Sequence, residues 1–586
     1  MVFSCINLIH CVRSFRRDHS AYRKHLSTKD SFLRNSSLPT AIGITSARPI
    51  GIVLVTAIVV AYILIGLTGH DPWKQDETYI FGIIQEILEN GDWVIPRVAG
   101  EPFMEKPPLF HWVATIFAIA SRQWLSLHDG ARLASGVFVA ISALTVGWTA
   151  KNLWGNGAGR YSVLIFLGSI GMGLYAHLMI TDLPVVAGTA IACSAIIFLR
   201  THVVRAGLLL GTGVGMGFLG KGLFLPGVVT ITALILSVLF KQWRCRATLK
   251  CVIFASIASL PWLLVWPISL YVRSPTLFHE WFWMNNVGRF LGFSVELLGS
   301  PNSHGYWFRT LPWFTFPVAP LAMIGTVKKF NIAKTDARLQ FLATLVTVMT
   351  ATLFYSASAR ASYALPLLVP LALLGAQAAH ELPMKIDAVF DWFGRVLFWC
   401  IAITVWTTWL LVASGHVLRW KWLTEKLPAN TVGSHPIAIV TGVLLTISIA
   451  VITTRLTQIR GRGVVGWTIG FQLSLGLLLT IWLPWLDEAK SYRSVFMSMR
   501  QAMPNSSGCM QSVGLGESER AMLRYVLGIN TLRYENVIAP SCELFLIEGL
   551  AATPPITSDM AGWVLLWDGA RPTDTRERLW LYERAL

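Results

Sequence analysis

The sequence predicts an all-helical, multi-pass membrane protein that carries a small C-terminal α/β domain. Of its 586 residues, 54% are hydrophobic and only 13% are charged, about half the charged share of a typical soluble domain. Too few polar side chains remain to cover a soluble protein of this length, so long apolar runs must face lipid. The net charge of +17 does not indicate a nucleic-acid partner, because the cations are divided among short clusters between apolar runs.

The first spanning helix is expected at residues 50–68, after a basic and polar segment at 1–49. This segment is longer than the basic start of a signal peptide, and no small-residue cleavage site follows the apolar run. We therefore expect residues 1–49 to form a basic cytoplasmic extension, either a disordered arm or the product of an early translation start.

The distribution of Lys and Arg predicts the orientation in the membrane. Residues 70–108 are acidic and follow the first helix, so we expect a periplasmic loop at 70–130. The apolar stretch 109–125 is short and interrupted, and the four basic clusters beyond it fall inside the cell only if this stretch lies in the outer interface. The basic loop 415–435 falls outside in the same scheme and argues against it. The four clusters are Lys151/Arg160, Arg200/Arg205, Lys241/Arg244/Arg246/Lys250 and Lys328/Lys329/Lys334/Arg338.

About thirteen spanning helices are predicted within residues 50–486, with a second periplasmic loop at 273–311. An odd number of spans and a cytoplasmic N-terminus put the C-terminus outside the cytoplasm. After the first span, the expected spans are 131–150, 160–178, 183–199, 206–219, 222–240, 251–272, 312–327, 339–356, 362–380, 394–414, 436–453 and 464–486.

Residues 487–586 are much less apolar and are expected to fold as a periplasmic α/β domain. Residues 518–527 have the pattern of an amphipathic helix that ends at Gly528. The runs 544–547 and 563–567 are typical of short buried strands.

Cysteine spacing predicts neither a zinc site nor a disulfide framework. The chain has eight Cys, without CxxC or Cys/His zinc spacing. Cys509 and Cys542 lie in the C-terminal region, where an oxidising compartment would let them form one disulfide.

Ionisable side chains collect in the expected outer loops, close to the apolar spans. Each has an ordinary explanation: solvated acids, a surface ion pair, a helix N-cap, a snorkelling Lys, an interfacial anchor or a polar loop. Together they suit a lipid-linked phosphate, because cations stabilise a phosphate leaving group and a carboxylate can act as general base. The carboxylates are Asp76, Glu77 and Asp182, and the cations are Lys106, Lys221, Arg289 and Arg360.

The motif Gly220-Lys221-Gly222 lies between two apolar runs. Glycines allow a tight turn and the close approach of a ligand. The motif is not a phosphate-binding P-loop, because the preceding Gly spacing and the following Ser or Thr are missing.

The order of motifs resembles the bacterial GT-C glycosyltransferases, a family that includes protein-O-mannosyltransferase-like enzymes and the aminoarabinose transferases that modify lipid A. The resemblance covers about residues 50–380 by motif and the remainder by topology only. The motifs are Asp76-Glu77, Glu89-Asn90-Gly91-Asp92-Trp93-Val94-Ile95-Pro96, Glu105-Lys106-Pro107-Pro108, Thr181-Asp182-Leu183-Pro184, Gly220-Lys221-Gly222 and Tyr363-Ala364-Leu365-Pro366.

This resemblance implies a GT-C fold and an enzyme of the bacterial inner membrane with its site on the periplasmic face. The enzyme would move a hexose or pentose from an undecaprenyl-type polyprenyl phosphate, among membrane lipids, to lipid A, another glycan or a protein. Transfer would be a single displacement that inverts the anomeric carbon.

The same resemblance implies roles for individual residues. Asp76 matches the acceptor-side catalytic position and Asp182 a second essential carboxylate, whereas Lys106 and Arg289 match the cations that hold the carrier phosphate and Glu105 lies near them. We add Glu77 to the catalytic group, Lys221 and Arg360 to the phosphate-binding group, and Tyr363 and Asn286 to the substrate-binding group. The aminoarabinose transferases have a Glu-His pair where this chain has Asn285-Asn286. A divalent metal therefore stays an open alternative without a supporting ligand motif, and we assign no metal ligand and no cofactor.

The alternative function is a lipid or polar-solute transporter or flippase. Transporters commonly place ionisable residues near the membrane midplane, often in repeated halves. Here the acids and cations lie in expected outer loops and no repeat is visible, which favours a transferase.

Overall fold

The computed structural model describes residues 50–74, 76–328, 335–414, 436–455, 459, 461–504, 508–535, 542–553, 562–572 and 574–585. The predicted basic extension at 1–49 and the basic loop 415–435 lie outside the described residues.

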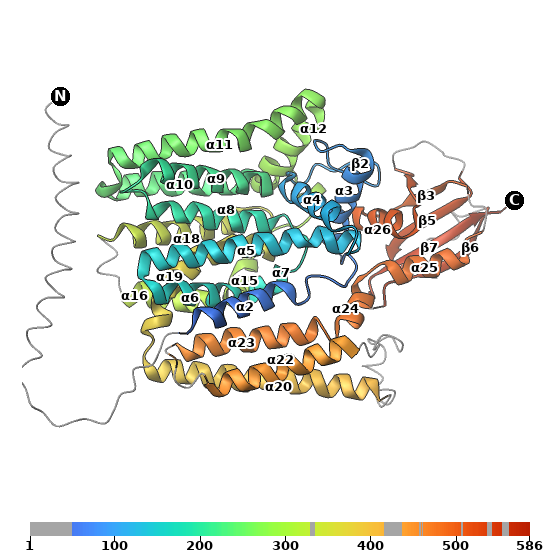
Figure 1. Ribbon diagram of the computed structural model, residues 1–586. Coiled ribbons are helices and arrows are strands. Elements are labelled where there is room, and N and C mark those ends of the chain that lie inside the picture. Colours follow the sequence, from blue (N-terminus) through green and yellow to red (C-terminus); the bar gives the residue numbers. More distant parts are fainter. Residues whose placement is uncertain are drawn as a thin grey trace, which may run out of the picture.

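A bundle of roughly parallel helices forms the body of the molecule (Figure 1). Within the described ranges, seven helices are long and apolar enough to cross a membrane, or nine if each of two bent pairs is one span. Helices satisfy their own backbone hydrogen bonds, so they can cross lipid, and the chain is a multi-pass membrane protein. The seven are α5 (Leu127–Trp154), α9 (Val203–Lys221), α11 (Arg246–Arg273), α18 (Ala337–Tyr355), α20 (Met384–Ala413), α22 (Pro436–Arg455) and the run of η4 (Ala361–Leu367) with α19 (Leu368–Glu381).

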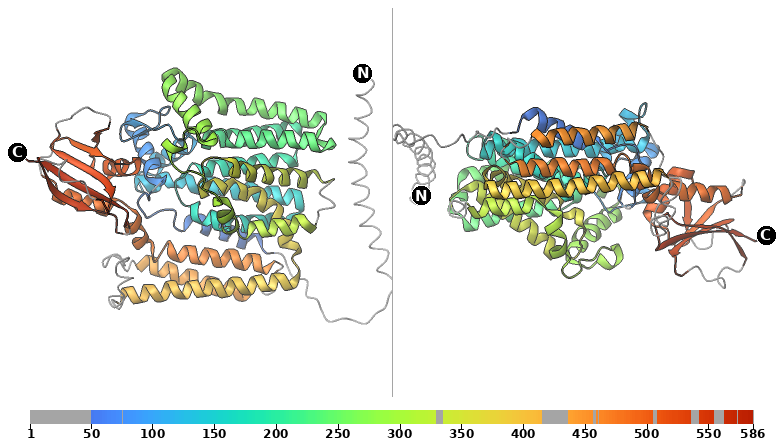
Figure 2. Two further views of the ribbon diagram at one scale, coloured as in Figure 1. Left: turned by 180° about the vertical axis from the view of Figure 1, so that it is seen from behind. Right: turned by 90° about the horizontal axis from the view of Figure 1, so that it is seen from below.

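Shorter apolar helices complete the bundle. They are α2 (Ile52–Leu64), α4 (Leu109–Ser121), α6 (Asn156–Leu167), α8 (Asp182–Ser194) and α10 (Phe224–Leu239). Helix α8 is buried along almost its whole length and packs mainly against α5 and α9. Helices α20, α22 and α23 (Arg462–Leu478) form a layer at one side (Figures 1 and 2). The number of thirteen spans stays a prediction.

Three spans that were predicted as single helices are broken. The stretch 312–327 is divided between α15 (Tyr306–Phe314) and α16 (Val318–Lys328), which meet at 87°. The last span bends by 65° between α23 and α24 (Leu483–Lys490). Pro317 precedes α16 and Pro484 lies in the first turn of α24, and proline lacks the N–H that a continuing helix needs. Residues 160–178 divide between α6 and α7 (Ile170–Tyr175), where Ser169 caps the second helix.

Helix α4 begins and ends at the same end of the bundle. Lys106, just before it, lines a cleft at that end, and His128, shortly after it, hydrogen-bonds Tyr525 of the C-terminal domain at 2.9 Å. A helix whose two ends lie on one side does not cross the bundle, which agrees with the predicted interfacial position of residues 109–125.

We call this end of the bundle the domain end, because the C-terminal domain lies beyond it in both views of the long axis (Figures 1 and 2). It also carries α3 (Asp76–Asn90) and the hairpin of β1 (Arg97–Val98) and β2 (Glu101–Pro102). Helix α26 (Glu517–Leu527) of the C-terminal domain packs on α3, where Thr78 donates a hydrogen bond to Ser518 at 2.8 Å.

The C-terminal domain contains a five-stranded mixed sheet in the order β4-β3-β5-β7-β6. Strand β3 (Met510–Val513) is parallel to β4 (Thr531–Arg533) and β5 (Leu544–Leu550), whereas β7 (Glu577–Arg584) is antiparallel to β5 and β6 (Trp563–Gly569). Helix α25 (Arg493–Ala502) belongs to the same domain (Figure 1). The predicted helix at 518–527 is confirmed and ends at Gly528 in the left-handed conformation.

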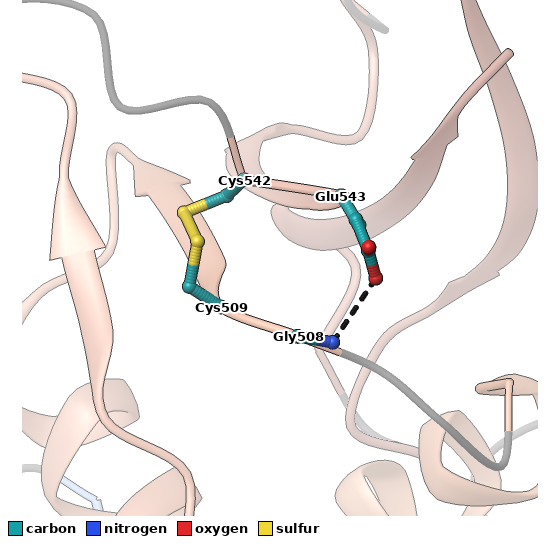
Figure 3. The surroundings of a disulfide bond; sticks show 4 residues. All are labelled: Gly508, Cys509, Cys542 and Glu543. Carbon is teal, nitrogen blue, oxygen red and sulfur yellow. Dashed lines mark hydrogen bonds between the residues drawn. A yellow bond between two sulfur atoms is a disulfide. The ribbon is translucent and has the colours of Figure 1, made fainter. Parts of the chain in front are cut away.

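The predicted disulfide is also confirmed: Cys509 and Cys542 are bonded, with their Cα atoms 5.0 Å apart (Figure 3). It ties the segment before β3 to the segment before β5. The prediction for β6 was wrong in one respect, because this strand lies at the sheet edge and Val564 is 54% exposed. An edge strand has a single neighbour, so its apolar side chains need not be covered.

Candidate functional site

The two carboxylates expected to take part in chemistry begin two helices at the domain end. Asp76 is the first residue of α3 and Asp182 is the first residue of α8. The partial positive charge of a helix N-terminus stabilises a carboxylate at such a position. Asp76 accepts a hydrogen bond from the Tyr79 hydroxyl at 2.6 Å, one helical turn further along α3. Asp182 is 4% exposed and forms an ion pair with Lys221.

Glu77 faces a different environment from its neighbour Asp76. Its carboxylate accepts hydrogen bonds from Arg132 Nε at 3.0 Å and from the backbone N–H groups of Trp73 and Met179 at 3.1 and 3.0 Å. Arg132 is fully buried and also donates to two backbone carbonyls just before α3. Glu77 is therefore buried in an ion pair that fixes the entry to α3, a surrounding that suits a positioning role.

Lys106 and Arg289 come from separate loops and share the carboxylate of Glu105. Lys106 Nζ lies 2.6 Å from Glu105 Oε1, and Arg289 pairs with the same oxygen. Arg289 begins the short helix α13 (Arg289–Leu291), directly after the π-helix η3 (Glu280–Gly288). Burial alone would raise the pKa of the Glu105 carboxyl, but the Lys106 and Arg289 charges hold that pKa well below its usual range. Glu105 is therefore ionised and holds the two cations close together.

Lys221 ends α9 and reaches toward both Asp182 and Tyr363. Its amine pairs with the Asp182 carboxylate and lies 3.6 Å from the centre of the Tyr363 ring, within cation–π distance. Gly222 has φ +70°, and a Cβ there would collide with the Asn286 side chain. A Cβ at Gly220 would meet the start of α8 at 3.0–3.2 Å. The predicted tight turn is thus present, and the glycines let Lys221 approach α8 closely.

Arg360 connects the remaining loop to Asp76. Its Nη1 lies 3.2 Å from Asp76 Oδ1, and its Nε donates to Ser300 Oγ at 2.8 Å. Backbone hydrogen bonds join residues 356–360 to residues 290–302. The loops that carry Arg289 and Arg360 are therefore held against each other.

These side chains surround a small cleft at the domain end. Counted with the residues that touch its wall, four cations (Lys106, Lys221, Arg289 and Arg360) face three carboxylates (Asp76, Glu105 and Asp182). The excess of positive charge and the burial of the cations favour an anionic ligand. The cleft is lined by Asp76, Tyr79, Ile80, Lys106, Ile180, Thr181, Asp182, Arg360, Ser362 and Tyr363.

Asn286 does not line this cleft. Its side chain donates to the Trp281 carbonyl at 2.9 Å and accepts from the Leu223 N–H at 3.4 Å. It therefore holds η3 against the turn after Lys221, one contact removed from the cleft. The three predicted groups otherwise converge: the acids of α3 and α8, the cations and Tyr363.

Sequence reasoning missed the polar cleft residues Tyr79, Thr181 and Ser362 and the buried Arg132. The spacing of Asp76 and Tyr79, three residues apart on one helix, was a usable signal. Arg132 gave none, since its partner Glu77 lies 55 positions earlier in the chain.

Metal-ligating residues gather elsewhere. Among the described side chains, one group of acids is close enough to share an ion: Glu519, Glu548 and Glu577, whose carboxylate oxygens lie within 4.8 Å of one another. The Lys74 amine already pairs with two of them, Glu519 and Glu577, so an internal cation occupies this position.

Comparison with known proteins gives one family match. Residues 105–275, which contain the segment from Glu105 to α11, match the family model of dolichyl-phosphate-mannose-protein mannosyltransferases.

Two curated relatives are undecaprenyl phosphate-alpha-4-amino-4-deoxy-L-arabinose arabinosyl transferases. The protein of Pectobacterium carotovorum is 28% identical over 378 residues, which cover 61% of this chain and 61% of the relative. The protein of Sodalis glossinidius is 30% identical over 381 residues, covering 61% and 63%. The chain thus spans about three fifths of the length of the curated relatives it matches.

The fold has a solved counterpart. ArnT from Cupriavidus metallidurans, in a crystal structure with undecaprenyl phosphate bound, superposes with a TM-score of 0.62 at 16% sequence identity. The match covers 90% of this chain and 97% of that chain. At this level of identity the likeness is one of fold.

Proposed function

This chain belongs to the GT-C family of membrane glycosyltransferases, and we propose on that premise that it transfers a sugar from a polyprenyl-phosphate carrier to an acceptor at the membrane surface. The relatives' names and the ligand of the ArnT structure support an undecaprenyl-type carrier. The names also make 4-amino-4-deoxy-L-arabinose, a pentose, the first sugar to test. The proposed acceptors are lipid A, another glycan or a protein.

The main observation that supports this proposal is that Lys106 and Arg289 both contact the ionised carboxylate of Glu105 beside the cleft. Two buried cations, Lys106 and Arg289, contact the single negative charge of Glu105, so the positive charge exceeds the negative charge in this group. The anionic phosphate of a lipid carrier bound beside them would be attracted by this excess of positive charge. Fixed cations at this position would also stabilise the charge that develops on a departing phosphate.

The proposed reaction is one displacement at the anomeric carbon. An acceptor oxygen forms a bond to that carbon from one side while the bond to the carrier phosphate oxygen breaks on the other, and the phosphate keeps the electron pair. For a hydroxyl acceptor, Asp76 receives the hydroxyl proton. For a phosphate acceptor no proton needs to leave, and Asp76 and Asp182 act by orientation. The product has inverted anomeric configuration.

The proposed location is the bacterial inner membrane, with the domain end in the periplasm. The disulfide Cys509–Cys542 supports this orientation, because disulfides persist in oxidising compartments. Basic residues at the other end of the long helices, such as Lys151 of α5, support it as well. Single-cysteine labelling of intact cells at Arg533 and at Lys151 tests it, with labelling by an impermeant reagent expected only at position 533.

Purified protein in liposomes tests the activity. Undecaprenyl-phosphate aminoarabinose and lipid A are supplied together, and the product is analysed by mass spectrometry. A product heavier by one aminopentose is expected, whereas an intact donor in every acceptor reaction would reject the assignment. A transporter would instead move the donor across the bilayer without cleaving it, which a leaflet-specific assay of the same liposomes detects.

A further inference from the structure

The segment between α2 and α3 is held by residues from the far end of the chain. Arg493 donates to both oxygens of Asp71, through Nε and Nη2, at 2.7 Å each. Asp487 accepts hydrogen bonds from the Asp71 N–H and the Trp73 indole at 2.9 Å each. These contacts cross more than 400 positions of sequence. Residues 71–74 therefore lie against α24 and the beginning of α25.

Lys74 extends this contact into the sheet of the C-terminal domain. Its amine lies 3.0 Å from a Glu519 carboxylate oxygen on α26 and also pairs with Glu577 on β7. The Glu519 side chain is 4% exposed and receives a second hydrogen bond, from the Tyr492 hydroxyl. Glu548 of β5 completes a group of three acids around the amine.

The position of Lys74 in the chain gives these contacts a consequence for the cleft. Lys74 precedes Asp76 by two residues, and Asp76 is the first residue of α3. Two residues of backbone span about 7 Å at most, so a fixed Lys74 restricts where Asp76 enters the cleft. Misplacement of a reacting group by about 1 Å can cost on the order of a hundredfold in rate.

We propose that Lys74, through its ion pairs with Glu519 and Glu577, is a positioning residue by which the C-terminal domain holds Asp76 in the position required for the reaction. This inference rests on the proposed transferase function and deepens it: the C-terminal domain becomes part of the catalytic unit. Lys74 itself does not line the cleft and touches no reacting atom.

Other contacts between the C-terminal domain and the bundle provide a control that distinguishes the docking of the domain from the positioning of Asp76. Arg533 of β4 pairs with Glu101 of β2 at 3.2 Å, and Arg524 of α26 pairs with Glu86 and Glu89 of α3. Arg533 is distant in sequence from residues 71–76 and contacts the hairpin instead. Its removal weakens docking without releasing Lys74, so it serves as the matched control.

The test compares four full-length variants in the liposome transfer assay: Lys74→Met, Lys74→Arg, Glu577→Gln and Arg533→Gln. We expect Lys74→Met to lower kcat at least tenfold while the KM for undecaprenyl-phosphate aminoarabinose changes less than twofold. Lys74→Arg should restore most of kcat, because it keeps a cation between the two carboxylates. Glu577→Gln should lower kcat less than Lys74→Met does, and Arg533→Gln should leave kcat unchanged.

Hydrogen exchange supplies a readout that does not depend on turnover. In Lys74→Met, amides of residues 76–81 should exchange faster, while those of β5 keep their wild-type rates. Wild-type kcat in Lys74→Met, or equal losses in Lys74→Met and Arg533→Gln, would overturn the inference. Absence of transfer activity in the wild-type protein would instead reject the proposed function. If Lys74→Met does not fold, Glu577→Gln tests the positioning role in its place, because the Glu577 side chain lies at the half-exposed end of the contact.

Discussion

Arg360 and Asp76 lie 284 positions apart in the chain, yet a guanidinium nitrogen of Arg360 is 3.2 Å from a carboxylate oxygen of Asp76. The Tyr79 hydroxyl donates to the same oxygen at 2.6 Å. The proposed base is therefore held by two donors, and its lone pairs are partly used before an acceptor arrives. An acceptor hydroxyl has to compete for this carboxylate, whereas an acceptor phosphate could bind Arg360 instead.

The first prediction concerns that pair. Arg360→Gln removes one of the two donors to the Asp76 carboxylate, leaving the Tyr79 hydroxyl, and also removes a cation from the cleft. With a phosphate acceptor we expect kcat/KM to fall by about a hundredfold, or about 2.7 kcal/mol of transition-state stabilisation, and with a hydroxyl acceptor by a smaller factor. Parallel assays with lipid A and with a neutral glycan acceptor measure the difference. Equal losses for both acceptors would contradict the proposed contact with acceptor phosphate.

The second prediction concerns carrier binding. Lys106→Ala and Arg289→Ala should each lower the transfer rate at least tenfold, which corresponds to about 1.4 kcal/mol. Each removes one of two cations that share Glu105. Glu105→Gln should lower the transfer rate less. It removes the carboxylate that holds the two cations in place, but it also removes the group that competes with the carrier phosphate for them. Transfer rates of correctly inserted variants provide the check, and wild-type rates in both Ala variants would exclude the role.

The third prediction concerns the chemical step. Asp76→Asn should damage transfer to a hydroxyl more than transfer to a phosphate, because only the hydroxyl has to lose a proton. Asp182→Asn should lower transfer to both, since it breaks the ion pair with Lys221. Product configuration measured by NMR should be inverted. Retention, or full activity of the Asp76→Asn/Asp182→Asn double variant, is incompatible with the mechanism.

The fourth prediction concerns pH. Burial, together with the neighbouring Glu519 charge, raises the pKa of Glu548 from 4.5 to about 8, against the lowering effect of Lys74. A carboxyl with a higher pKa in the folded state binds more protons when folded, so the free energy of unfolding falls as pH rises from about 4.5 to about 8. Glu577 and the Gly516 N–H also face this carboxyl.

Glu548→Gln keeps the shape of the side chain without its charge. We expect its melting temperature to exceed that of the wild type at pH 8.5 and to match it at pH 5. Thermal unfolding followed by tryptophan fluorescence across this range measures the effect. A constant difference between the two proteins at all pH values would show that Glu548 does not titrate there.

The fifth prediction concerns the disulfide. In the chain-entropy description, a crosslink that closes 33 residues stabilises by about 3–4 kcal/mol. Cys509→Ser/Cys542→Ser should therefore lower the melting temperature of the C-terminal domain and leave the helical bundle intact. Domain-resolved hydrogen exchange distinguishes the two parts, and uniform loss of protection would contradict a local effect.

Much of the fold could be predicted from local sequence patterns. Apolar runs of span length identify α5, α11 and α20 directly, and Gly528 marks the end of α26 because glycine readily adopts the left-handed conformation found there. The breaks at α15–α16 and α23–α24 were less accessible. Proline predicts a bend but not its angle, which packing against neighbouring helices decides.

The candidate site, like the fold, could be predicted from the sequence only in part. Charged side chains are rare beside apolar spans, so the sequence alone pointed to Asp76, Asp182, Lys106 and Arg360. Their pairing was not, since the partners in Arg360–Asp76 and Lys221–Asp182 come from different loops. Lys74 gave no signal at all: a lone Lys in an acidic loop is ordinary until α26 and β7 place two carboxylates around it.

Strand β7, which supplies Glu577, lies inside its sheet between β5 and β6. The sheet therefore lacks an inner strand until residues 577–584 have been synthesised, long after Asp76 has left the ribosome. Under the positioning role proposed for Lys74, a chain truncated between α26 and β7 keeps the Glu519 contact and lacks the Glu577 contact, so it should transfer sugar more slowly than the untruncated chain.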